Sequence, residues 1–397
     1  MIFNTWVFGL FAMIGLLVYW SIVPARNRPH ALIALGAMFY AYSVPAYLLL
    51  IVALATITYT LGHAMLRSDG SQRKRKLFLI LGVATIAGTL FFFKYTKFLA
   101  ATVDQVAGHN ILPLPNIVVP LAISFFTFEF VHVLVDIYLR KIVALDLLDF
   151  AVFTMFFPTL VAGPIKRFES FAPQVRSIEM PSTQTFLLNA YRVVIGLTKK
   201  TVIADSMTLF IQPILLPSDI YGRLDYWVAM FAYAAKIYFD FSGYSDIAIG
   251  MSGLLGLRIP ENFERPYHAP NIAQFWRRWH MSLSSWIRDY IFIPLGGSRG
   301  SRFVTACNLF VAMGIAGLWH GAAWTFVVWG LWHGVGLAVH RSWQLTVVPK
   351  VAILRAGGRF VRLASVGTTF AFVVVGWLLF AAPSFPNAYH AFIHLFA

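Results

Sequence analysis

Long apolar stretches recur along the whole 397-residue chain, and their length constrains the fold more than any other feature. A helix needs about 20 mostly apolar residues to cross the hydrocarbon of a bilayer. Hydrophobic residues make up 59% of the chain and charged residues only 12%, too few polar groups to cover a soluble domain. Because every backbone polar group must be satisfied inside lipid, this pattern predicts an all-α, polytopic integral membrane protein.

The apolar segments predict about 10–12 tilted or re-entrant helices. Segments 31–43, 147–163 and 185–198 are shorter than a full crossing, so they fit re-entrant or buried helices equally well. Segment 225–256 fits either one tilted span or two halves broken at Gly243. The candidate segments lie near 5–24, 31–43, 45–66, 77–95, 116–138, 147–163, 185–198, 201–216, 225–256, 303–319, 322–346 and 361–382.

The net charge of +15 falls in short basic clusters between the apolar segments. Such clusters favour anionic membrane lipids as partners, and no nucleic-acid-binding motif accompanies them, so no nucleic-acid partner is expected. The single cysteine, Cys307, excludes an intramolecular disulfide and is expected to be a buried, inert thiol. No internal repeat or linker is evident, which predicts one membrane-embedded domain over residues 1–397.

The segment from Asn271 to Tyr290 carries apolar residues every three or four positions, which predicts one amphipathic helix. Arg277 and Arg278 lie on its polar face, and a helix with Trp-rich and Arg-rich faces should lie in the membrane interface. His280 lies at the border between the faces, where it could face a partly wet crevice. The pattern also fits a surface helix that only anchors the fold, with His280 in an ordinary hydrogen bond. The apolar face comprises Ile272, Trp276, Trp279, Leu283, Trp286 and Tyr290.

A second histidine, His320, interrupts a long apolar run and precedes Gly321, which leaves room for a ligand or a helix break. An ionisable residue at membrane depth is a functional-site hypothesis, and imidazole exchanges protons near neutral pH. The alternative is a packed histidine bonded to a backbone carbonyl. His333 competes with His320 for the same role, and His340 does so more weakly.

Two carboxylates, Asp240 and Asp246, lie in apolar surroundings, where each would cost about 2.5–3.5 kcal/mol at a helix centre. We expect them to pair with Arg or His or to line a polar cavity, and a structural ion pair is favoured over catalysis. None of the spacings among these histidines matches a zinc pattern and no acidic residue follows Asp289, so no metal site is predicted. No phosphate-binding loop, dinucleotide fingerprint or serine-nucleophile elbow is present.

Several motifs in one order resemble the membrane-bound O-acyltransferase (MBOAT) family, in its bacterial AlgI/DltB-like branch. The resemblance implies a ring of tilted helices around a central tunnel, with a motif-bearing core of about 225–340. It also implies that His320 is catalytic, together with His280 near the donor side. The matching residues are 238–246, 267–270, 275–280 continuing to 290, and 317–321, and residues 293–297 look like the alginate-acetylation type. The residues expected to bind substrate are Trp276, Arg277, Arg278, Trp279, Ser282, Asp240 and Trp319.

The resemblance further implies an O-acyltransferase of the bacterial inner membrane, which moves a non-aminoacyl group, with acetyl favoured. The donor would be a cytoplasmic thioester, either acetyl-CoA or an acyl-carrier protein, used as a co-substrate with no bound cofactor. The acceptor would be a hydroxyl of an exported polysaccharide or a periplasmic partner such as a second acyltransferase. Neutral His320 would take the hydroxyl proton during attack on the thioester. The alternatives are D-alanyl transfer to a cell-envelope polymer, a transporter, or a scaffold of a polysaccharide-modification complex.

Overall fold

The chain folds into helices. The computed structural model describes residues 3–68, 70–109, 111, 117–352, 354 and 358–396, and these residues contain no strand, which confirms the all-α prediction. Residue 116, where one predicted span begins, lies outside the described residues. The chain divides into two compact units, residues 1–197 with 244–260 and residues 198–243 with 261–397. The single domain therefore stays a prediction, and each unit is described by itself.

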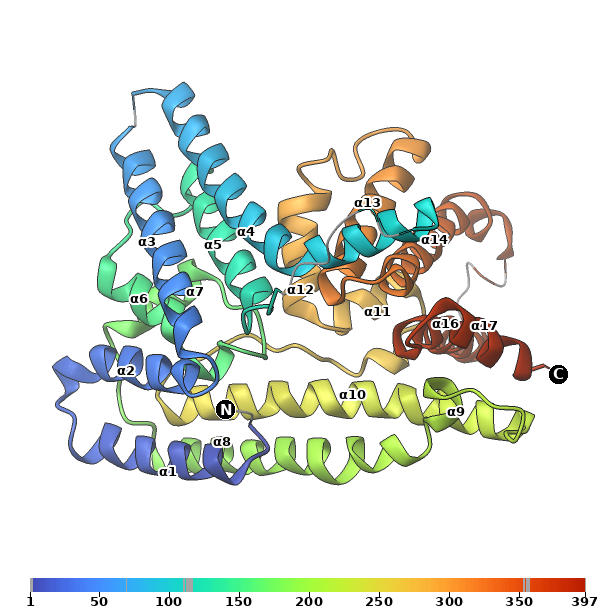
Figure 1. Cartoon of the computed structure of the whole chain (residues 1–397), viewed down its shortest axis with the longest axis horizontal. Helices are drawn as coiled ribbons and strands as arrows, with labels where there is room; N and C mark the ends of the chain where they lie inside the picture. Colours follow the sequence, from blue (N-terminus) through green and yellow to red (C-terminus); the bar gives the residue numbers. More distant parts are fainter. Residues whose placement is uncertain are drawn as a thin grey trace. The chain divides into compact units, whose positions relative to one another are not determined.

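The first unit contains three long helices that pack side by side (Figure 1). They are α3 (Pro45–Arg67), α4 (Gln72–Ala107) and α5 (Ile123–Tyr138). Lys166 and Glu129 form an ion pair that is almost fully buried in this unit. The remaining helices of the unit are α1 (Trp6–Ser21), η1 (Ala25–Asn27), α2 (Arg28–Ala41), α6 (Leu147–Met155), η2 (Phe157–Thr159), α7 (Phe168–Val175) and α8 (Thr183–Leu197).

Helix α10 (Arg223–Leu254) supplies residues to both units. Its last turns belong to the first unit, where Asp246 accepts a hydrogen bond from Nε of Arg192 in α8 at 2.9 Å. In the second unit, Asp240 forms an ion pair with Lys200 at 2.7 Å. Asp246 is therefore paired with an Arg, as predicted, whereas the partner of Asp240 is a Lys instead of the predicted Arg or His. The helix is continuous through Gly243, so the predicted alternative of two broken halves is wrong.

A hairpin of α13 (Arg302–His320) and α14 (Trp324–Thr346) forms the centre of the second unit. Two glycines let its helices approach closely. A Cβ atom at Gly317 would lie 2.2 Å from the carbonyl oxygen of Phe326, and one at Gly330 would lie 2.2 Å from that of Met313. The unit also contains η3 (Thr198–Ala204), η4 (Ser206–Leu209), α9 (Gln212–Leu215), η5 (Pro266–His268), α11 (Ile272–Arg278), α12 (Met281–Ile287), η6 (Arg288–Phe292), η7 (Val348–Lys350), α16 (Arg359–Ala381) and α17 (Phe385–His394).

Four of the described helices, α3, α4, α13 and α16, are long and apolar enough to cross a membrane by length and composition. They support a multi-pass protein, while the number of crossings and the central tunnel stay predictions. The predicted helix 201–216 is wrong, because the chain there forms the short pieces η3, η4 and α9 with Pro213 at the start of α9. Cys307 is exposed on α13, so its predicted burial is also wrong.

Candidate active site

The predicted interfacial helix of residues 271–290 is broken at His280, and that break builds the candidate site. Asn271 caps α11 by accepting a hydrogen bond from the Gln274 amide, and the helix ends at Arg278. His280 then adopts left-handed backbone angles, φ 45° and ψ 56°, before α12 begins at Met281. Such a backbone costs a non-glycine residue about 1–3 kcal/mol, and strain of this kind concentrates at functional sites.

Asn262 explains why the helix breaks. Its carbonyl oxygen accepts a hydrogen bond from the Met281 amide at 2.9 Å. Its side-chain oxygen accepts from the amide and the hydroxyl of Ser282, at 3.3 and 2.8 Å. These bonds replace those that a continuous helix would make at this point. The apolar face of the predicted helix survives the break, because Ile272, Trp276, Trp279, Leu283 and Trp286 are all buried.

His280 is fully buried, which corrects the prediction that it faces a partly wet crevice. Its Nδ1 donates to Oδ1 of Asn262 at 3.2 Å, so the lone pair of the neutral ring lies on Nε2. Among the described residues, Nε2 has no hydrogen-bond partner. Burial lowers the pKa of His280 well below its usual value, and the nearby charge of His320 lowers it further. The ring is therefore a neutral imidazole with one free acceptor atom.

His320 is the last residue of α13, and Gly321 directly after it is extended. The ring is only partly buried. It is held by aromatic neighbours, with centroid distances of 4.7 Å to Trp319, 5.1 Å to Trp329 and 5.0 Å to Phe380. The carbonyl groups at a helix C-terminus carry partial negative charge, and His320 lies beside them. This placement suits a base that becomes imidazolium during a reaction.

The two predicted catalytic histidines both contact one indole, that of Trp319. The Trp319 ring centroid lies 4.7 Å from that of His320 and 5.7 Å from that of His280. His280 also meets Phe241 edge to face at 4.5 Å. The structure thus brings His280 to Trp319 and His320, which lie about 40 positions further along the chain.

His333, the competitor to His320, lies in the same aromatic cluster but is fully enclosed. Its ring is 5.1 Å from Trp276 and 5.0 Å from Trp329. Neither ring nitrogen has a hydrogen-bond partner among the described residues. A base needs access to its substrate, so the partly exposed His320 fits that role better than the enclosed His333.

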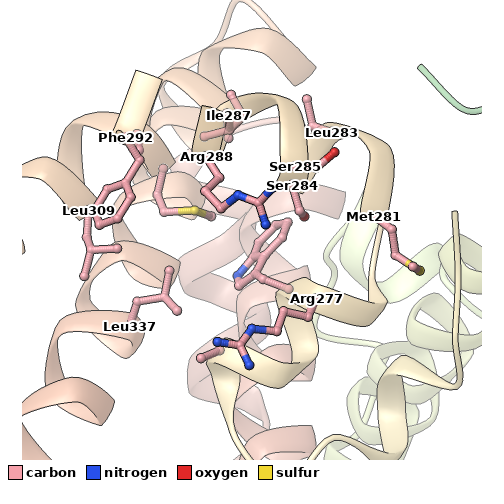
Figure 2. Close-up of a pocket in the computed structure, with 15 residues that line it drawn as sticks. Arg277, Met281, Leu283, Ser284, Ser285, Ile287, Arg288, Phe292, Leu309 and Leu337 are labelled. Atoms are coloured by element: carbon pink, nitrogen blue, oxygen red, sulfur yellow. The ribbon is translucent and has the colours of Figure 1, made fainter. Parts of the chain in front are cut away.

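A cavity of about 460 Å³ lies beside this cluster, between α11, α12, η6, α13 and α14. Its wall is mainly apolar and includes Ala316, one helical turn before His320. Figure 2 shows Arg277 and Arg288 reaching in from α11 and η6, with Leu309 and Leu337 on the opposite wall from α13 and α14. Arg288 is paired with Asp289 at 2.8 Å. The cavity can therefore accommodate an apolar chain with an anionic group near the arginines.

The other predicted substrate-binding residues fall into different environments. Trp276 and Arg277 line the cavity. Trp279 is buried against Trp377 at 4.9 Å, and Ser282 is bonded to Asn262, so both support the site from inside. Arg278 does not line the cavity. Asp240 is held by Lys200 in an ion pair.

Sequence reasoning missed Asn262, Trp329 and Phe380, which orient the two histidines. Trp329 and Phe380 look like ordinary core residues in an apolar run, and Asn262 lies in a loop 18 positions before His280. No local pattern marks them, because their role depends on contacts between segments that are distant in the chain.

Residues 37–354 match the model of the MBOAT, membrane-bound O-acyltransferase family. The chain belongs to this family. It is 36% identical over 402 residues to the probable alginate O-acetylase AlgI of Pseudomonas aeruginosa, an alignment that covers 100% of this chain and 75% of that protein. The identity to the peptidoglycan O-acetyltransferase of Helicobacter pylori is 32% over 420 residues, covering 98% and 78%. The teichoic acid D-alanyltransferase of Bacillus subtilis is 28% identical over 407 residues, covering 95% and 98%. This MBOAT chain is therefore a membrane acyltransferase, as predicted.

Proposed function

We propose that this MBOAT protein moves an acetyl group from a cytoplasmic thioester to a hydroxyl group of an exported polysaccharide, in the inner membrane of a bacterium. The names of the alginate and peptidoglycan relatives support the acetyl group and the polysaccharide acceptor. The observation that carries the proposal is the arrangement of His280 and His320 around Trp319. It provides one neutral acceptor nitrogen inside the protein and one accessible imidazole beside it.

His320 acts as the general base. It takes the proton of the acceptor hydroxyl as that oxygen attacks the thioester carbonyl, which forms the new C–O bond. The C–S bond then breaks, and the proton passes from imidazolium to the departing thiolate, so His320 returns to its neutral form. Base catalysis by a positioned imidazole is worth about 10²–10⁴-fold in rate.

His280 positions the reacting groups through its free Nε2, which accepts a hydrogen bond from the acceptor hydroxyl or from the protonated His320. Asn262 holds the tautomer that this role needs. The surrounding indole rings exclude water, which protects the thioester from hydrolysis.

The cavity beside α11 holds the thioester arm of the donor in this proposal. Its apolar wall suits the arm, and Arg277 suits a donor phosphate, because guanidinium groups bind phosphate oxygens in pairs. Arg277 is exposed and makes no ion pair among the described residues, so its donors are available. Replacing Arg277 with Ala should raise the KM for the thioester with a smaller change in kcat. Arg299→Ala is the matched control, because Arg299 is an exposed arginine that does not line the cavity.

The test incubates the purified full chain with radiolabelled acetyl-CoA, acetyl-carrier protein or D-alanyl-carrier protein, together with a soluble polysaccharide. We expect acetyl label in the polymer with the intact protein and none with His320→Ala. His340→Ala, which changes a half-buried histidine of α14, should transfer label like the unchanged protein. Transfer of D-alanine instead of acetate would replace the proposed substrate, and full transfer by His320→Ala would refute the proposed base. A scaffold or transporter predicts no label in the polymer at all.

A further inference from the structure

Three potential metal ligands outside the candidate active site come together where α17 ends. They are Asp219, in the segment before α10, and His390 and His394 of α17. The donor atoms of all three residues lie within 4.8 Å of one another. Nε2 of His390 is 3.7 Å from Oδ1 of Asp219. The two histidines are four positions apart, so they lie on the same face of the helix.

Both histidines make their hydrogen bonds through Nδ1 and not through Nε2. Nδ1 of His394 donates to the carbonyl oxygen of His390 at 2.9 Å, and because a carbonyl only accepts, the lone pair lies on Nε2. Nδ1 of His390 is 3.0 Å from the hydroxyl of Tyr226. A histidine that binds a metal through one nitrogen usually bonds its other nitrogen to such a second partner, which orients the ring. Both histidines have that partner.

The three ligands are also accessible to an ion. The side chain of Asp219 is 98% exposed and that of His390 is 30% exposed. The two imidazole rings stack with centroids 4.0 Å apart and planes at 17°. A small rotation of the exposed Asp219 side chain, together with small shifts of the two half-buried imidazoles, can bring two nitrogens and one carboxylate oxygen to a common centre.

We propose that Asp219, His390 and His394 bind one Zn²⁺ ion, with water in the remaining position. Two imidazole nitrogens and one carboxylate suit zinc, whereas Ca²⁺ and Mg²⁺ prefer oxygen ligands throughout. The ion ties α17 to the segment that leads into α10. The sequence alone predicts no metal site, because the acidic ligand lies far from the two histidines in the chain. None of the three residues belongs to the acyl-transfer site, so this proposal does not depend on the proposed function.

The test uses the full chain in detergent, purified without a polyhistidine tag and stripped with a chelator. Zinc is added back, and bound metal and the midpoint of thermal unfolding are both measured. We expect one tightly bound Zn²⁺ per chain and a higher midpoint with zinc. His390→Gln and His394→Gln should abolish the site, and Tyr226→Phe should weaken zinc binding about 10–100-fold by removing the second partner of His390. His109→Gln is the control and should bind zinc like the unchanged chain. His109 is exposed and bonds its Nδ1 to the Ala107 carbonyl, but it does not belong to the group of three potential ligands.

Asp219→Asn tests the site without disturbing the core, because this side chain is almost fully exposed. It should weaken zinc binding while the zinc-free chain unfolds at the same temperature as the unchanged protein. The proposal is overturned if the unchanged chain binds no stoichiometric zinc. It is equally overturned if His390→Gln and His394→Gln bind zinc as tightly as the unchanged chain.

Discussion

Replacing Gly317 with Ala tests how the α13–α14 hairpin positions His320. The added Cβ would lie 2.2 Å from the carbonyl oxygen of Phe326, whereas real Cβ atoms stay at least 3.0 Å from such neighbours, so the helices must separate by about 0.8 Å. The obstacle is backbone, which cannot rotate away. Overpacking of this kind costs about 1–3 kcal/mol. A displacement near 1 Å at a catalytic group can cost about 100-fold in rate.

Gly314→Ala is the matched control, because its Cβ would lie 3.7 Å from the nearest atom, a side-chain carbon of Leu331. Both substitutions gain the same helix propensity of alanine, about 1 kcal/mol, so the difference between them isolates the steric effect. The assay compares thermal unfolding in detergent and the rate of acyl transfer. We expect Gly317→Ala to unfold at a lower temperature and to transfer more slowly than Gly314→Ala. Equal stability and rate in the two variants would refute the close-packing argument.

Three further predictions concern buried polar groups. Replacing Lys166 with Met should lower the free energy of unfolding by about 3–5 kcal/mol, because it leaves the Glu129 carboxylate buried alone. Adding Glu129→Leu should recover most of this loss. Denaturant unfolding of the single and the double variant checks this prediction, and equal losses in the two would contradict it. The pKa of His280 is lowered by burial, so below pH 6.5 the unfolded chain takes up a proton that the folded chain does not. The free energy of unfolding should therefore fall by up to about 1.4 kcal/mol per pH unit as the pH drops below 6.5, and His280→Gln should show a shallower dependence in unfolding measured from pH 5 to 7. His333→Leu should unfold at an unchanged or higher temperature, because it removes two buried nitrogens that have no hydrogen-bond partner among the described residues. A marked drop in the unfolding temperature would contradict this prediction, because it would show that the two ring nitrogens make hydrogen bonds in the folded protein.

Much of the helical layout could be predicted from the sequence, because apolar length and periodicity depend on local residues. Helices α3, α8 and α13 begin and end close to the predicted segments. The pairing of Asp240 and Asp246 with cations was also predictable, since an unpaired carboxylate in apolar surroundings is costly.

The break at His280 could not be predicted, because periodicity reports which residues share a face and not which distant group competes for the backbone. Asn262 supplies that competing group from another segment. The full burial of His280 has the same origin, since Phe241 and Trp319 cover it from other helices. The catalytic assignment of His320 came from motif resemblance, and it stays a prediction until it is measured.

The measurement that tests the central claim most directly is the single-turnover rate of acyl transfer by His320→Ala, with and without added imidazole. Base catalysis by this ring predicts a loss of about 10²–10⁴-fold, and partial recovery when free imidazole enters the space that the partly exposed side chain leaves. A variant that transfers the acyl group at nearly the rate of the unchanged protein, without imidazole, would contradict the account.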